Sequence, residues 1–165
     1  MIDVDTVTPL VAPLADALRA KGWRLATAES CTGGLIAAAC TTLAGSSDWF
    51  ERGFVTYSDA AKTEQLGVDA ALIEHHGAVS EAVVCAMAAG ALARSPADIA
   101  VAVTGIAGPG GAVPGKPVGT VWLALMQRGG AVQAERLQLG GDRAGIRTQT
   151  VVIALQRLRA MCADC

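Results

Sequence analysis

The segment over residues 25–34 constrains this chain most, because it places hydroxyl, thiol and carboxyl groups between a strand-like run and the start of a helix. Residues 25–28 are mostly small and apolar, as in a buried strand, and Ser30 follows them closely. Gly33 and Gly34 then precede an apolar helical run. A helix beginning there has unpaired N–H groups and the positive end of its dipole at the strand end. The segment therefore predicts a site that stabilises an anion or an oxygen gaining negative charge.

Apolar periodicity predicts alternating helices and strands along the chain. A glycine-containing turn at residues 128–130 predicts that the last two strands pair as an antiparallel hairpin, which makes the sheet mixed. This order of elements indicates an α/β/α sandwich. The predicted helices cover residues 5–21, 34–43, 60–66, 80–94 and 142–161, and the predicted strands cover residues 23–28, 53–57, 98–104, 118–127 and 131–139.

The length of 165 residues suits one domain over residues 1–165. A domain of this size removes about 70% of the surface of its unfolded chain from water without needing disulfides or metal. Hydrophobic residues make up 52% of the chain, yet only three Trp, two Phe and one Tyr contribute rings. We therefore expect a core filled by Ala, Val, Leu and Ile, with helices packed closely on the sheet.

Charge and hydropathy argue against two classes of partner. The formal net charge of −2 provides no basic surface for nucleic acid. No apolar run approaches the roughly 20 residues that a membrane span needs, and the first residues lack the basic and apolar regions of a signal peptide. We expect a cytoplasmic protein that binds neither nucleic acid nor membranes.

Five scattered cysteines, an odd number, fit reduced thiols better than a disulfide framework. Cys162 and Cys165 form a C-x-x-C pair without a second ligand pair, which is typical of a chain end rather than a zinc site. The glycines match neither the G-x-x-x-x-G-K-[ST] motif nor a G-x-G-x-x-G motif placed after a strand. The sequence therefore argues against nucleoside triphosphates and dinucleotides as ligands. We expect neither a metal nor a cofactor.

Ser30 is a candidate nucleophile, and its hydroxyl needs a base. His75 and His76 lie together in a polar stretch that is typical of a solvated helix end. Lys62 is the better candidate, because it follows Tyr57 by five residues and both can face the opening above the sheet. A lysine base requires that burial or nearby positive charge lower its pKa from about 10.4 towards neutrality, a change worth about 4 kcal/mol. The alternative is a solvated surface lysine.

The sequence leaves the roles of three neighbouring side chains undecided. Cys31 is either a rival nucleophile at a helix N-terminus or a packed thiol. Tyr57 either hydrogen-bonds in the site and orients Lys62 or is a ring at the edge of the core with a solvated hydroxyl. Glu29 is an acid, a base or only an orienting group, and the sequence assigns it none of these.

Residues 105–119 form a long loop with six glycines and three prolines, and loops of this length are usually functional or disordered. Because the loop follows a buried strand, we expect it to cover the same sheet edge as Ser30. It is either a mobile lid or a cradle of N–H groups to which Lys116 adds charge. Arg143 and Arg147 share one helix face, either as a clamp for phosphate or carboxylate or as a solvated surface.

Seven ordered motifs occur along the chain: AESCTGG at 28–34, GSS at 45–47, VTYS at 55–58 with AK at 61–62, GAVS at 77–80, TGIAGP at 104–109, KPVGT at 116–120 and GDR at 141–143. Together they resemble the CinA carboxy-terminal domain family over residues 10–158. The resemblance implies a three-layer sandwich with a mixed, mostly parallel five-stranded sheet, and homo-oligomers are common in that family. Its stand-alone members are nicotinamide-nucleotide amidases, which hydrolyse nicotinamide mononucleotide to nicotinate mononucleotide and ammonia in pyridine-nucleotide recycling.

The resemblance implies roles for individual residues. Ser30 would be the nucleophile and Lys62 its base, with Tyr57 and Ser47 near the reaction centre. Thr104 and an arginine of the GDR segment would lie in the pocket. The chain departs from the family at Asp59, where Asn is usual, and a carboxylate there favours the charged form of a nearby lysine.

The expected reaction is acyl transfer, in which Ser30 attacks a carboxamide and N–H groups near Gly33 and Gly34 bind the oxyanion. Arg143, Arg147 and Lys116 are the candidate cations for the substrate phosphate. Two alternatives stay open: a non-catalytic nucleotide-binding or regulatory module of the CinA type, and an amidase for another small carboxamide. The complete expected substrate-binding set is Thr32, Gly33, Gly34, Ser47, Thr104, Gly105, Lys116, Arg143 and Arg147.

Overall fold

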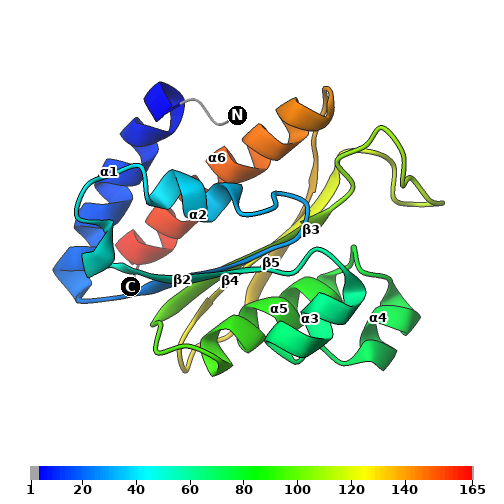
Figure 1. Ribbon diagram of the computed structural model, residues 1–165, viewed down its shortest axis with the longest axis horizontal. Helices are drawn as coiled ribbons and strands as arrows, with labels where there is room; N and C mark the ends of the chain where they lie inside the picture. The colour runs from blue at the N-terminus through cyan, green and yellow to red at the C-terminus, as the bar shows by residue number, and fades with distance from the viewer. Residues whose placement is uncertain (1–3, 165) are drawn as a thin grey trace.

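The computed structural model describes residues 4–164, in which helices and strands alternate along most of the chain (Figure 1). None of the helices in this part of the chain is long and apolar enough to cross a membrane. The elements are α1 (Val4–Lys21), β1 (Leu25–Glu29), α2 (Leu35–Cys40), the 3₁₀ helix η1 (Ser46–Asp48), β2 (Phe50–Val55), α3 (Asp59–Leu66), α4 (Ala70–His76), α5 (Glu81–Ala93), β3 (Ile99–Gly105), β4 (Thr120–Gln127), β5 (Gln133–Gln138) and α6 (Arg143–Asp164).

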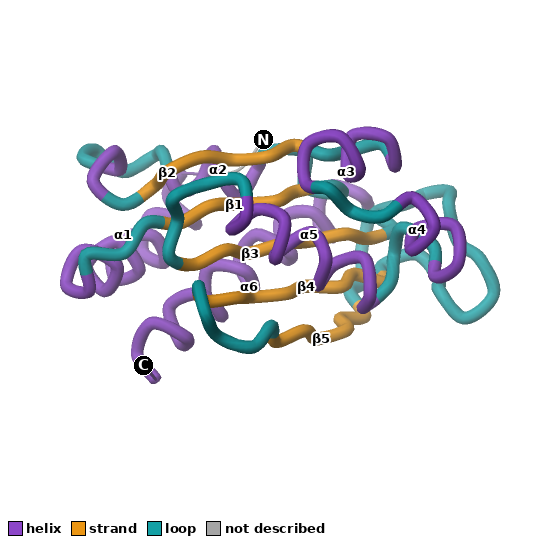
Figure 2. Tube along the Cα trace, turned by 90° about the horizontal axis from the view of Figure 1, so that it is seen from below, coloured by secondary structure: helices purple, strands orange, loops and turns teal. Residues whose placement is uncertain are grey.

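The strands form a mixed five-stranded sheet within residues 4–164, in the order β2-β1-β3-β4-β5 (Figure 2). Strand β1 pairs in parallel with both β2 and β3. The two last strands pair as the predicted antiparallel hairpin, and β4 also runs antiparallel to β3. Only β4 therefore runs against the other four strands of this sheet. The carboxyl ends of β1, β2 and β3 meet at one edge.

Helices cover both faces of the sheet, with α1, α2 and α6 on one side and α3, α4 and α5 on the other (Figure 1). Alternate residues of β3 face the two layers. Ile99, Val101 and Val103 belong to the core beneath α1, α2 and α6, whereas Ala100 and Ala102 belong to the core beneath the other helices. The expected three-layer α/β/α sandwich is confirmed, and aliphatic side chains and alanine fill most of it.

Local capping chemistry fixes several helix ends. The hydroxyl of Ser80 accepts a hydrogen bond from the Val83 N–H and starts α5, as its residue type predicts. Asp142 accepts a bond from the Gly145 N–H at 2.8 Å and starts α6 in the same way. Helix α1 ends at Lys21, and Gly22 follows it with a φ of 65°, which suits glycine better than any other residue.

Several boundaries differ from those expected, and one helix was not expected. Helix α4 has only seven residues, too few for an apolar period to stand out, and it begins at the side-chain cap of Asp69. Strand β2 starts at Phe50 rather than residue 53, because pairing with β1 and the ion pair of Glu51 with Arg24 extend it across polar residues. Helix α2 ends early at Cys40, and η1 follows it.

Candidate active site

Ser30 and Lys62 meet where the parallel strands end. Ser30 directly follows β1, and Lys62 lies on α3, which begins just after β2 because the hydroxyl of Ser58 caps it. Lys62 Nζ lies 3.1 Å from Ser30 Oγ and donates to the Thr56 carbonyl at 3.0 Å. Lys62 is only 1% exposed, so it is not the solvated surface lysine that was the alternative. The structure thus brings together the two residues expected to act as nucleophile and base.

The surroundings of the dyad favour a neutral amine and a protonated thiol. Burial lowers the pKa of Lys62, and the carboxylate of Asp59 raises it by a smaller amount. Burial raises the pKa of Cys31 to about 12, so this thiol keeps its proton at neutral pH. A neutral amine can accept a proton from Ser30, whereas a thiol that stays protonated is a poor nucleophile. Cys31 therefore fits the packed-thiol alternative.

A cavity of about 220 Å³, here called the dyad cavity, opens above Ser30 and Lys62. Thr104 borders it and donates its hydroxyl proton to the Ala78 carbonyl at 2.9 Å, which leaves the oxygen free to accept a hydrogen bond. The cavity is lined by Ser30, Cys31, Tyr57, Asp59, Lys62, Ala78, Val79, Thr104, Gly105, Ala107 and Arg143.

A second cavity of about 690 Å³, here called the α6 cavity, shares Ala107 and Arg143 with the dyad cavity. It is bordered by residues 141–144 and Arg147 at the start of α6, together with Pro109 and Val118 of the long loop. The two spaces together offer room for a ligand larger than the dyad cavity alone could hold.

Tyr57 stands at the entrance of the dyad cavity and is 61% exposed. Its hydroxyl accepts a hydrogen bond from Arg143 Nη2 at 3.1 Å, and its backbone carbonyl accepts one from Lys62 Nζ at 3.4 Å. Arg143 Nη1 also donates to the Gly108 carbonyl at 2.9 Å. Arg143 thereby links α6, the end of β2 and the long loop, and Tyr57 contacts Lys62 through its main chain.

Glu29, which the sequence left without a role, caps α2. Its side chain is fully buried and accepts hydrogen bonds from the Thr32 hydroxyl at 2.6 Å and from the N–H groups of Gly34, Ile36 and Ala37 at 3.2, 3.0 and 2.8 Å. Four donors around one carboxylate make it an anion held by a helix start rather than a group available to a substrate. An acidic residue next to a helix start was the signal that could have revealed this role.

Comparison with known proteins places the chain in a family. The family model of the CinA C-terminal domain matches residues 7–162. The chain belongs to the CinA C-terminal domain family. Two relatives, each named nicotinamide-nucleotide amidohydrolase PncC, come from Enterobacter agglomerans (56% identical, 85% of each chain covered) and Pseudomonas putida (54% identical, 94% of this chain and 96% of the relative). A solved competence-damaged protein (CinA) superfamily structure from Klebsiella pneumoniae has a TM-score of 0.92 at 43% identity, over 96% of this chain and 99% of the other.

The glycine pair of this CinA C-terminal domain does not supply the expected oxyanion donors. The N–H of Gly33 donates to the Ser30 carbonyl at 3.0 Å, and that of Gly34 donates to Glu29. Thr32 is fully buried and its hydroxyl is also bound to Glu29. These three expected substrate-binding residues border neither the dyad cavity nor the α6 cavity. A buried carboxylate occupies the start of α2, so the N–H groups of Gly33 and Gly34 are engaged within the protein, whereas the role of Thr32 in substrate binding stays a prediction.

Two other expected residues of the site lie elsewhere. Ser47 is exposed in η1, before the first residue of β2, and so lies at the opposite end of the sheet from Ser30. The length of β1 separates the two ends, which is about 16 Å at the usual rise per strand residue. Lys116 donates to the His76 carbonyl at 2.9 Å and borders neither cavity, so it ties the long loop to the exposed end of α4.

Of the remaining predicted site residues, two line the dyad cavity and one binds main-chain carbonyls. Gly105 and Thr104 border the dyad cavity, as expected from the strand end that carries them. Arg147 is half-buried and donates to the carbonyls of Cys31 and Thr32, so it is not part of a solvated face. No local signal in the sequence indicates that contact, because the partners lie more than a hundred residues apart.

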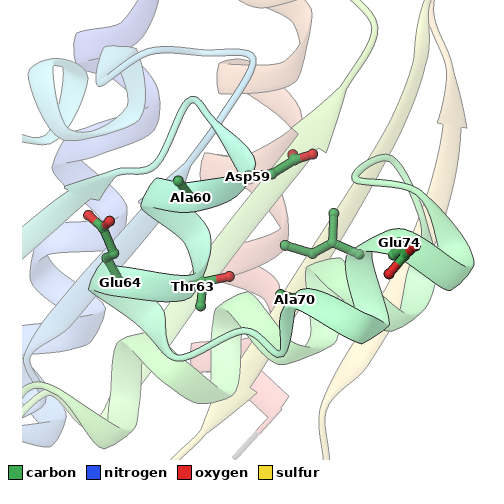
Figure 3. A pocket seen from close by; sticks show the side chains of 7 residues that line it. Asp59, Ala60, Thr63, Glu64, Ala70 and Glu74 are labelled. Atoms are coloured by element: carbon green, nitrogen blue, oxygen red, sulfur yellow. The ribbon is translucent and has the colours of Figure 1, made fainter.

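A hollow of about 500 Å³ lies between α3 and α4, and Asp59 borders both it and the dyad cavity. Figure 3 shows the carboxylates of Asp59, Glu64 and Glu74 standing apart from one another around it. No group of three or more His, Cys, Asp or Glu within residues 4–164 could hold a metal ion. Cys31, Cys40, Cys85 and Cys162 are free thiols, and Cys165 of the C-x-x-C pair lies outside the described residues.

Proposed function

We propose that this protein hydrolyses the carboxamide of nicotinamide mononucleotide, giving nicotinate mononucleotide and ammonia in the recycling of pyridine nucleotides. The amidohydrolase names of two relatives that match most of the chain support this substrate. The observation that carries the proposal is the buried Lys62 Nζ at 3.1 Å from Ser30 Oγ, beside a cavity. A buried amine next to a hydroxyl can activate it as a nucleophile without histidine.

In the first half of the reaction, the neutral amine of Lys62 takes the proton of Ser30 Oγ as that oxygen attacks the carboxamide carbon. A tetrahedral intermediate forms with a negative charge on the former carbonyl oxygen. The Lys62 ammonium then gives its proton to the amide nitrogen, the carbon–nitrogen bond breaks and ammonia leaves. The nicotinoyl group remains bound to Ser30 as an ester.

In the second half, water replaces ammonia in the dyad cavity. Lys62 takes a proton from this water as its oxygen attacks the ester carbon. The second tetrahedral intermediate collapses, the bond to Ser30 Oγ breaks and Lys62 returns a proton to that oxygen. The product is released as the carboxylic acid of nicotinate mononucleotide, which loses its proton to water at neutral pH, and the enzyme is free again.

The oxyanion needs donors other than those of Gly33 and Gly34. Within residues 4–164, the backbone N–H of Thr32 has no acceptor in the protein, and that of Cys31 is bonded only to the thiol of its own residue. They belong to the turn that directly follows the nucleophile, so we assign the oxyanion to them. Loss of one such donor typically costs about 3 kcal/mol of transition-state stabilisation. Thr104 Oγ1 would accept a hydrogen bond from the carboxamide nitrogen.

The phosphate of the substrate would lie in the α6 cavity, with Arg143 as its cation. Arg143 borders both cavities, and among the described residues two of its five N–H donors are engaged, by the Gly108 carbonyl and the Tyr57 hydroxyl. The nicotinamide ring would then occupy the smaller dyad cavity, with the ribose bridging the two. Lys116 has no part in this arrangement.

The proposal also includes the cellular compartment, the partners and the oligomeric state of the protein. Four free cysteines fit a reducing compartment, so we assign the protein to the cytoplasm, as one domain over residues 1–165. The net charge of −2 argues against nucleic acid as a partner. The resemblance to the CinA family supports a homo-oligomer, which light scattering on the purified protein tests directly.

The test of the function is ammonia release from nicotinamide mononucleotide by purified protein. Ser30→Ala and Lys62→Met should each lower kcat on the order of a thousandfold or more, as removal of a nucleophile or its base does elsewhere. Far-UV circular dichroism checks that both variants fold. A non-catalytic nucleotide-binding module would show a higher Tm with the nucleotide and no ammonia, and an amidase of another specificity would prefer a different carboxamide in a substrate panel.

A further inference from the structure

We infer that Arg147 is a positioning residue for the catalytic turn, residues 30–33, and sets the rate of the reaction rather than the affinity for the phosphate of the nucleotide. The inference rests on the proposed function, because it concerns how the oxyanion donors of that reaction are aimed. It assigns to Arg147 a role that differs from the phosphate clamp expected from its spacing to Arg143.

Arg147 reaches the catalytic turn from a helix on the same side of the sheet as α2. Its Nε donates to the Cys31 carbonyl at 3.1 Å, and its Nη2 donates to the Thr32 carbonyl at 3.1 Å. A guanidinium presents its donors in a rigid planar fork, so one side chain fixes two successive carbonyls at once. The neighbouring Ile146 is buried in the core and anchors this part of α6.

Fixing these carbonyls also fixes the N–H groups that the proposed reaction uses. In a planar trans peptide the C=O and N–H bonds point in opposite directions. The Cys31 carbonyl and the Thr32 N–H belong to one peptide unit, so Arg147 orients that N–H by holding the carbonyl on its other side. The preceding unit is held by the Gly33 N–H, which donates to the Ser30 carbonyl at 3.0 Å and thereby orients the Cys31 N–H.

Glu29 holds the same turn with the opposite charge. It accepts hydrogen bonds from the Thr32 hydroxyl at 2.6 Å and the Gly34 N–H at 3.2 Å, while Arg147 donates to the carbonyls. Neither Glu29 nor Arg147 borders the dyad cavity, so neither touches the reacting carboxamide. Arg147 does border the α6 cavity, which makes a phosphate ligand the competing role that an experiment has to separate.

The deciding experiment measures kcat and KM of Arg147→Lys with nicotinamide mononucleotide, with Arg159→Lys as the matched control on the exposed side of α6. A lysine keeps the positive charge that a phosphate needs, but its ammonium cannot hold two carbonyls in a fork. We expect kcat to fall about a hundredfold, the size of effect that a small misplacement of catalytic groups produces, with KM nearly unchanged. The control should match the wild-type protein in both constants.

Two further measurements separate positioning from general damage. The pH at the midpoint of the acid limb of kcat should stay at its wild-type value, because Lys62 remains buried, whereas a disrupted site would expose Lys62 and move that midpoint upward. Arg147→Ala should regain part of its kcat when guanidinium ion is added at millimolar concentration, and ammonium ion should not replace it. Melting curves accompany both variants.

Each remaining outcome overturns the inference. A raised KM with unchanged kcat in Arg147→Lys would make Arg147 a phosphate ligand. Failure of both the Lys and the Ala variant to fold would make it a residue of the fold, and a shifted acid limb would mean general disruption. Absence of ammonia release by the wild-type protein would instead contradict the proposed function, so the two failures are distinguishable.

Discussion

Replacing Glu29 with glutamine removes one of the two carboxylate oxygens that hold the start of α2. Oε2 accepts hydrogen bonds from the Thr32 hydroxyl and from the N–H groups of Gly34 and Ile36, and Oε1 accepts one from the Ala37 N–H. Glutamine keeps the side-chain length and one acceptor oxygen but replaces the other oxygen with an NH₂ group, which only donates. At least one buried N–H therefore loses its acceptor.

The size of the effect follows from these four contacts. A buried donor left without an acceptor costs about 1 to 3 kcal/mol, and each of the three remaining bonds weakens by about 1 kcal/mol when its acceptor is no longer charged. Burial of a neutral amide costs less than burial of a carboxylate, which offsets part of this loss. We expect the free energy of unfolding of Glu29→Gln to fall by about 3 kcal/mol.

Urea unfolding followed by far-UV circular dichroism measures this difference, provided that the m-value stays constant. Glu64→Gln, the same chemical change on the exposed surface of α3, is the control and should alter the free energy of unfolding by less than about 0.5 kcal/mol. If Glu29→Gln were as stable as this control, the buried carboxylate would not be what holds the start of α2, and the account of the catalytic turn would fail with it.

Three other substitutions test separate parts of the structure. Lys62 acts as a base only when neutral, so activity falls as the pH drops through its pKa; Asp59→Asn removes a carboxylate that raises this pKa and should move the acid limb of the kcat/KM profile to lower pH. Cys31→Ala should keep ammonia release at roughly the wild-type rate, since burial raises the pKa of the thiol to about 12 and keeps it protonated. Gly90→Ala should lower the free energy of unfolding by about 1 to 3 kcal/mol in urea titrations, because the added Cβ would collide with the Leu66 carbonyl on α3.

For each of these three substitutions, one outcome would contradict the expectation. An acid limb that stays in place in Asp59→Asn would mean that this carboxylate does not act on Lys62. Loss of ammonia release in Cys31→Ala alone, with Ser30→Ala active, would make the thiol the nucleophile. A Gly90→Ala protein more stable than the wild type would mean that the helix preference for alanine outweighs the contact between α3 and α5.

Local signals in the sequence account for most of the architecture. The apolar period of α1 and α6, the cap of Ser80 and the turn at residues 128–130 each involve residues close together in the chain, and the structure confirms the elements they predicted. Helix α4 and the start of β2 escaped prediction for two different reasons. A seven-residue helix shows too little period, and β2 is extended by pairing with β1 rather than by its own composition.

The sequence by itself determined that Ser30 follows a buried strand and that Lys62 lies on the helix after the second strand. Neighbouring residues set both features, because they decide where strands end and helices begin. Only the tertiary structure decided that Lys62 is buried against Ser30, that Arg147 holds the catalytic turn and that Ser47 lies at the far end of the sheet. Burial and long-range hydrogen bonds depend on which segments pack together, and no local pattern of residues carries that information.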